Sequence, residues 1–288
     1  MLNIKKILLP VDLPNTALPV LHQAAMLAHR LNAQLIMLHI VTPASRAAGV
    51  PENASASGGW DLLAEVLKSA QKNGDDSLAL ELKGLPIERM LGTGDVMGAI
   101  VQTAQEQIID LIMMPSHGVT FDQFLLGSVT AKVLRHAEPP VWTGAHVQAP
   151  LAQKFAIRNI LCAVDFLDHS RTSVALAKQW AAEFGARLTL AHATAQAELW
   201  GPGGDVVDPE LKEKLDADAT RHMAEFQKDV GTDAAVFIGN GDVSKVLAQA
   251  TKQTNADLLV LGSRPYGGHL RTYGYAIICA VGIPVLSV

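Results

Sequence analysis

The feature of this sequence that most limits its possible folds is an internal repeat. Residues 7–12 (ILLPVD) line up with residues 160–165 (ILCAVD), an offset of 153. Further along the chain, residues 92–96 (GTGDV) line up with residues 239–243 (GNGDV), an offset of 147. Matches that keep their order, with one change of length between them, indicate a duplicated unit. We therefore expect two domains, at 1–144 and 157–288, joined by a linker at 145–156.

Each copy alternates short β-rich apolar runs with segments whose apolar residues recur at helical spacing. In the first copy we expect strands at 4–11, 34–41, 86–91, 110–114 and 139–143, and helices at 15–31, 60–83, 95–107 and 127–137. In the second we expect strands at 158–164, 187–192, 235–238, 257–261 and 284–288, and helices at 170–184, 209–229, 242–254 and 274–281. This order predicts an α/β fold of two doubly wound, five-stranded, mostly parallel sheets with helices on both faces.

Composition and charge exclude some classes of partner and location. The net charge is −5 and no Lys/Arg cluster could neutralise a run of phosphates, so we expect no nucleic-acid partner. No apolar run reaches membrane-spanning length, and the amino-terminal residues do not resemble a signal peptide, so we expect a cytoplasmic protein without membrane contact. Cys162 and Cys279 lie in apolar runs and are expected to be reduced core residues.

A candidate phosphate loop follows the fourth strand of the first copy. It contains Ser116 and Gly118, and then Gly127, Ser128 and Val129 at the expected start of a helix. Glycines let a loop turn its backbone N–H groups inward, and a helix start attracts anions. The structural alternative is that Gly127 and Ser128 only cap the helix and Gly118 only turns the loop.

This segment resembles the universal stress proteins, whose nucleotide-binding members carry Gly-x-x-Gly followed by Gly-Ser/Thr at this place. The resemblance implies an adenine-nucleotide alpha-hydrolase-like fold and a non-catalytic stress-response module that binds ATP or AMP. It also implies contacts from Asp12 to the adenosine and from the backbone of Val41 to the adenine. Family members pair their last strands, which here implies an internal pseudo-dimer; a further homodimer and protein partners stay open.

Both copies depart from the family pattern. Pro115 stands where the first glycine is expected, which removes one N–H donor and fixes φ near −65°. In the second copy Asp165, Gly262 and Gly274 remain, but Tyr275 replaces the Ser/Thr. We therefore expect weak nucleotide binding, in the first copy.

Aspartates near strand ends have a structural interpretation as well. Asp12 and Asp165 could act as helix N-caps or turn residues, with or without a ligand. The Gly-x-Gly-Asp segments that end in Asp95 and Asp242 are expected to end the third strand and cap the next helix.

Other activities have less support. No P-loop or dinucleotide motif occurs. The histidines are scattered and no metal site is expected, with His39 and His192 architectural at equivalent strand positions. The alternative function is a slow ATPase or hydrolase that uses the loops around His117 and His269, with the presence of a metal left open.

Overall fold

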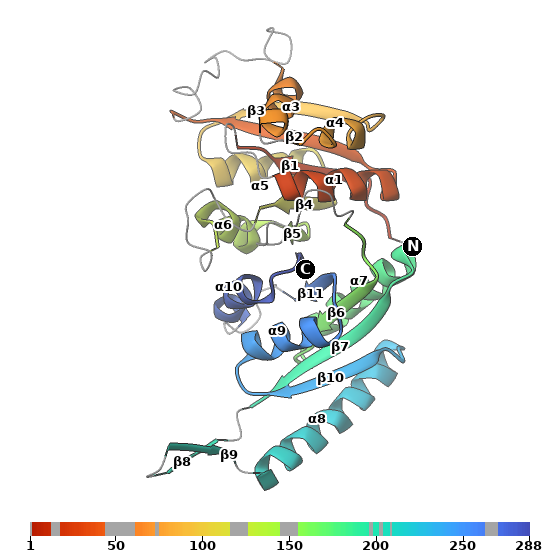
Figure 1. Cartoon of the computed structure of the whole chain (residues 1–288), viewed down its shortest axis with the longest axis vertical. Helices are drawn as coiled ribbons and strands as arrows, with labels where there is room; N and C mark the ends of the chain where they lie inside the picture. Colours follow the sequence, from red (N-terminus) through yellow and green to blue (C-terminus); the bar gives the residue numbers. More distant parts are fainter. Residues whose placement is uncertain are drawn as a thin grey trace. The chain divides into compact units, whose positions relative to one another are not determined.

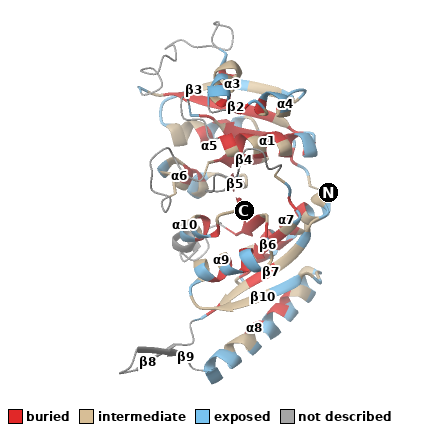
Figure 2. Ribbon diagram, viewed as in Figure 1, coloured by how far each residue is buried: buried red, intermediate tan, exposed pale blue. Residues whose placement is uncertain are grey.

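The structure is a computed structural model (Figure 1). In it, the apolar runs of the sequence form buried strands (Figure 2). The structure describes residues 2–12, 18–43, 61–72, 75–115, 126–144, 155–195, 198–201, 204–207, 209–262 and 270–288. The chain forms two compact units, Asn3–Phe155 and Ala156–Val288 together with Leu2. We call them the N-terminal and C-terminal domains.

The N-terminal domain is a parallel sheet with the strand order β3-β2-β1-β4-β5. Its strands are β1 (Lys6–Pro10), β2 (Gln34–Val41), β3 (Ile87–Thr93), β4 (Leu111–Met114) and β5 (Val141–Thr143). Its helices are α1 (Leu18–Leu31), α3 (Leu62–Lys72), α4 (Leu78–Glu81), α5 (Val96–Glu106) and α6 (Ser128–His136).

Helices cover both faces of this sheet because its strands are apolar on both sides. Leu8 of β1 belongs to a buried cluster that also contains Ile100 of α5 and Val133 of α6. Its neighbours Ile7 and Leu9 are equally buried, and alternate residues of a strand point to opposite faces. Contacts of α1 with β1, β2 and β4 account for the second face.

The C-terminal domain repeats this arrangement, with the order β10-β7-β6-β11-β12 and parallel pairing throughout. Its strands are β6 (Asn159–Ala163), β7 (Arg187–Thr194), β10 (Ala235–Asn240), β11 (Leu258–Leu261) and β12 (Val285–Ser287). Its helices are α7 (Asp168–Phe184), α8 (Pro209–Val230), α9 (Val243–Gln253) and α10 (Leu270–Val281). The predicted fold class is therefore confirmed.

A two-stranded antiparallel sheet, β8 (Glu198–Gly201) and β9 (Gly204–Val207), is additional to this plan. The sequence did not lead us to expect these two strands, because glycine and proline, which recur in this stretch, are depleted in strands.

The predicted helix caps are confirmed in both copies. Asp95 is the N-cap of α5 and accepts a hydrogen bond from the N–H of Gly98 at 2.8 Å. Asp242 is the N-cap of α9 and accepts from the N–H of Lys245 at 3.0 Å. Such a side-chain cap satisfies one of the N–H groups that a helix start leaves without a partner inside the helix.

The two cysteines lie in the C-terminal domain and form no disulfide. Cys162 is buried in β6, where burial raises the pKa of its thiol, and Cys279 is half-buried in α10. Over the described ranges, no helix combines the length and the apolar character needed to cross a bilayer.

Candidate functional site

The strand order reverses between β1 and β4. The chain leaves β1 for β2 on one side and returns from β3 to β4 on the other side of β1. At such a reversal the connections diverge, and ligands of open parallel sheets bind there. Asp12 follows β1 and Pro115 follows β4, so both lie at this edge of the sheet.

Asp12 is exposed at the surface, and Val41 is the buried last residue of β2. Partial loss of solvent raises the pKa of the Asp12 carboxyl, and the nearby His39 opposes that rise. Ser116 and Gly118, together with His117 and His269, lie outside the described residues.

Helix α6 begins directly beside the end of β4. Gly127 is its N-cap in an extended conformation, φ −55° and ψ 136°, and gives no side-chain cap. Ser128 and Val129 therefore form the first turn, whose N–H groups the helix itself does not use and which carries partial positive charge. Thr130 Oγ1 donates to the carbonyl of Pro115 at 2.9 Å and joins this helix start to the strand end.

The structure defines the position of each residue of the Gly-Ser pair. Gly127 does occupy the cap position, as the structural alternative required, but Ser128 is the first helical residue and not the cap. The first turn thus lies next to the residue that follows β4. Thr130, which is 3% exposed, was not on our list of site residues, although it stands in the same motif.

In the C-terminal domain the equivalent aspartate is already bound by its own chain. Asp165 Oδ1 accepts from Ser170 Oγ at 2.6 Å and from the N–H of Leu167 at 3.1 Å. Asp165 Oδ2 is 2.8 Å from His169 Nε2. The structural interpretation of Asp165 as a turn residue is therefore confirmed.

Gly262, the residue after β11, lies against side chains of α7. A Cβ on Gly262 would lie 2.7 Å from His169 Cδ2 and 2.9 Å from Ser173 Oγ. Side chains of α7 thus fill the space beside this glycine. Asp165 precedes α7 and His169 lies in its first turn, so the sequence alone predicted neither this pair nor the packing on Gly262.

Phe166, the residue after Asp165, packs against aromatic rings of the same domain. Its ring lies 4.3 Å from that of His192 and 6.0 Å from that of Phe226, between centroids. Its backbone has φ 63°, a conformation that is costly for an aromatic residue and is maintained here by this packing.

The histidines of the second strands have the structural role we expected. His39 Nδ1 donates to the carbonyl of Val11 at 2.9 Å. His192 Nδ1 donates to the carbonyl of Val164 at 2.7 Å, and burial lowers the pKa of this ring. Each histidine ties β2 or β7 to the residue that ends the first strand of its domain.

Our expectation for Gly274 is wrong. The prediction placed Gly274 at the start of a helix, by analogy with Gly127, but α10 begins at Leu270. Gly274 and Tyr275 therefore lie inside the helix, where each N–H bonds to the carbonyl four residues earlier. In the described part of the C-terminal domain, the position that aligns with Ser128 is therefore not a helix start.

No group of three or more His, Cys, Asp or Glu side chains that could hold a metal ion occurs among the described residues. The described part of the site therefore consists of one aspartate, the end of β2 and the amino end of α6.

Comparison with known proteins agrees with this arrangement. Residues 3–143 and 156–273 each match the profile of the universal stress protein family. A universal stress protein of Methanocaldococcus jannaschii is 30% identical over 149 residues, which are 48% of this chain and 92% of that protein. Universal stress protein A homolog 2 of Coxiella burnetii is 32% identical over 137 residues, 47% of this chain and 91% of that protein.

A solved structure extends the likeness to both domains. The crystal structure of a universal stress protein from Archaeoglobus fulgidus covers 98% of this chain and 95% of its own, with 20% identity and a TM-score of 0.62. At this identity the match concerns the fold. The two profile matches, which together span most of the sequence, show that the chain belongs to the universal stress protein family, as two domains of that family in tandem.

Proposed function

We propose that this protein is a non-catalytic module that binds an adenine nucleotide, ATP or AMP, weakly and in its N-terminal domain. The observation that carries the proposal is the start of α6 beside the end of β4. Its first turn has no side-chain cap from Gly127, and the Thr130–Pro115 hydrogen bond holds it at the switch point of the sheet. An anion at this place would receive several backbone N–H donors together.

The contrast with the C-terminal domain supports a single site. There Asp165 is bound by Ser170 and His169, and Tyr275 lies inside α10. A nucleotide would have to displace these contacts, and it would find no helix start at the position of Tyr275.

Calorimetric titration with ATP and AMP tests the assignment on a matched pair of variants. Ser128→Tyr places a large side chain at the helix start and should weaken binding at least tenfold, a change of about 1.4 kcal/mol. Tyr275→Ser should leave the affinity unchanged, because the residue lies within a helix. If Ser128→Tyr binds like wild type, or Tyr275→Ser abolishes binding, the N-terminal assignment is wrong.

Turnover separates a binding module from the alternative enzyme. We expect no release of phosphate from ATP by the wild-type protein above that of the Ser128→Tyr variant. A rate that Ser128→Tyr removes would show an ATPase at this site and would overturn the non-catalytic part of the proposal.

We further expect the two copies to associate within the chain as a pseudo-dimer through their last strands, β5 and β12. Cysteine pairs engineered on these strands, in a chain without Cys162 and Cys279, should then form an intramolecular disulfide. Cross-links only between chains would contradict this expectation.

A further inference from the structure

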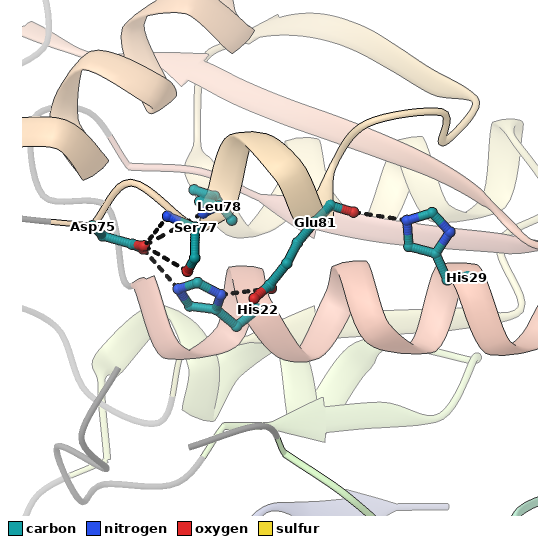
Figure 3. A network of polar contacts seen from close by, with 6 residues as sticks. All are labelled: His22, His29, Asp75, Ser77, Leu78 and Glu81. Carbon is teal, nitrogen blue, oxygen red and sulfur yellow. Dashed lines mark hydrogen bonds and ion pairs between the residues drawn. The ribbon is translucent and has the colours of Figure 1, made fainter. Parts of the chain in front are cut away.

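A polar network away from the nucleotide site joins α1 to residues 75–81 of the N-terminal domain (Figure 3). His22 of α1 lies between two carboxylates. Its Nε2 is 2.7 Å from Asp75 Oδ2, and its Nδ1 is 2.7 Å from Glu81 Oε2. His29, two turns further along α1, donates from Nε2 to the carbonyl of Glu81 at 2.7 Å.

The geometry defines the protonation state of His22. An ionised carboxylate only accepts hydrogen bonds, so each ring nitrogen that faces one must carry a hydrogen. A neutral imidazole has one N–H and one lone pair, and the lone pair would face a carboxylate oxygen at 2.7 Å. Both contacts are favourable together only when His22 is an imidazolium.

The two carboxylates differ in what they lose when the ring loses a proton. The Asp75 side chain is 1% exposed, whereas that of Glu81 is 40% exposed. Asp75 Oδ1 also accepts from the backbone N–H and the hydroxyl of Ser77, at 3.0 and 2.9 Å. Removing a donor from a buried carboxylate costs more than hydrating an exposed one, so the remaining proton stays on Nε2, toward Asp75.

We propose that His22 is a proton-operated clasp that holds helix α4 on helix α1, and that loss of its Nδ1 proton releases Glu81 while Asp75 stays bound. The carbonyl of Glu81 keeps its hydrogen bond from His29, so the release concerns the Glu81 side chain. Helix α1 also contacts β1, β2 and β4, and its Gln23 accepts a hydrogen bond from Trp142 of β5. Among the described residues, the charged groups that act on His22 are Glu81 and Asp75.

Electrostatics support this order of events. Burial alone would lower the pKa of His22, but hydrogen bonds and charges from Glu81 and Asp75 outweigh it, so the pKa rises above its ordinary value of 6.5. Burial alone would raise the pKa of Asp75, but Ser77 and His22 outweigh it, and the pKa falls below 3.8.

The directions of these two pKa shifts define the pH range in which the clasp is closed. A raised histidine pKa contributes stability that is complete below 6.5 and is lost as the pH rises through the folded-state value. A lowered aspartate pKa contributes stability that is present above 3.8 and is lost as the pH falls through the folded-state value. The clasp is therefore closed between the folded-state pKa values of Asp75 and His22, and it opens as the pH rises through the His22 value.

An NMR titration of the whole chain tests the proposal on the His22 ring and the backbone amides of α4. In wild type the ring should titrate above 6.5, and the amides of residues 78–82 should shift with the same midpoint. Glu81→Gln should lower the midpoint and uncouple these amides from it. Each pH unit of that decrease is a tenfold loss in the preference of the folded site for the protonated ring.

Two controls make the result specific. Glu65→Gln removes another partly exposed carboxylate, which pairs with Lys68 on α3, and should leave the His22 midpoint unchanged. In the C-terminal domain the position of His22 is Ala175, so the amides around that residue should show no such transition. A wild-type midpoint at or below 6.5, or equal midpoints in Glu81→Gln and Glu65→Gln, would overturn the clasp.

Discussion

The two domains have one strand order and similar helix caps, yet they differ at the edge of the sheet where a ligand would bind. In the N-terminal domain Asp12 is exposed and α6 begins at that edge. In the C-terminal domain Asp165 is bound by His169, Phe166 packs on His192, and α10 begins before the equivalent position. A duplicated fold can therefore keep its sheet while a few side chains change the surroundings of the aspartate that follows the first strand.

The largest expected effect on stability concerns Gly262 in the C-terminal domain. Gly262→Ala should destabilise the protein by about 1–3 kcal/mol, because the new Cβ would overlap His169 and Ser173 and force them to move. Gly274→Ala is the matched control. A Cβ there meets Leu261 at an ordinary 4.0 Å, and alanine favours a helix interior, so this variant should be neutral or slightly stabilised. Urea unfolding of both variants decides, and equal losses would show that close packing at Gly262 is not the cause.

ATP binding at the proposed N-terminal site should become stronger when the backbone N–H that Pro115 lacks is restored. Pro115→Gly adds a backbone N–H beside the start of α6 and should strengthen ATP binding about tenfold, roughly 1.4 kcal/mol, since a hydrogen bond to an anion contributes that much or more. The same change should slightly lower stability, because glycine has more freedom in the unfolded chain. Pro86→Gly controls for that loss, and calorimetry measures both affinities. No gain in a folded Pro115→Gly protein would show that Pro115 does not limit this site.

The smallest effect tests a difference between otherwise identical helix ends. Ile108 and Asn255 both follow a helix with positive φ, 51° and 49°, and each is followed by the same hydrogen-bonded turn. A β-branched residue is strained in this conformation, which asparagine tolerates. Ile108→Asn should therefore stabilise the protein by about 1 kcal/mol, measured as a higher urea midpoint. Asn255→Ile should lose a similar amount, and a change of the same sign in both would refute the backbone explanation.

Much of the fold could be predicted because the internal repeat presents each sequence signal in two copies. Weak local signals such as the Gly-x-Gly-Asp caps became secure when they recurred at a constant offset, and Asp95 and Asp242 are caps in the structure. The same reasoning failed at Gly274, because alignment with Gly127 assumed that both helices begin at equivalent residues. A helix can extend by a turn without moving the residues that align.

The candidate site was less predictable than the fold. Its residues come from strands far apart in the sequence, and their contacts depend on tertiary packing. Asp165 and Gly262 were identified, but no local pattern indicates that His169 would pack between them. The His22 network was not predicted for a similar reason. Asp75 and Glu81 are far from His22 in the sequence, and they meet it only when α4 lies on α1.

The satisfied carboxylate of Asp165 has a consequence for how the protein responds to heat. A ligand stabilises only the part of a protein that binds it, by about 2.7 kcal/mol at a concentration of one hundred times Kd. Because Asp165 already has its partners within the chain, added nucleotide would raise the melting temperature of the N-terminal half and leave the other half where it was. If the nucleotide binds as proposed, adding it should change the separation between the melting transitions of the two halves.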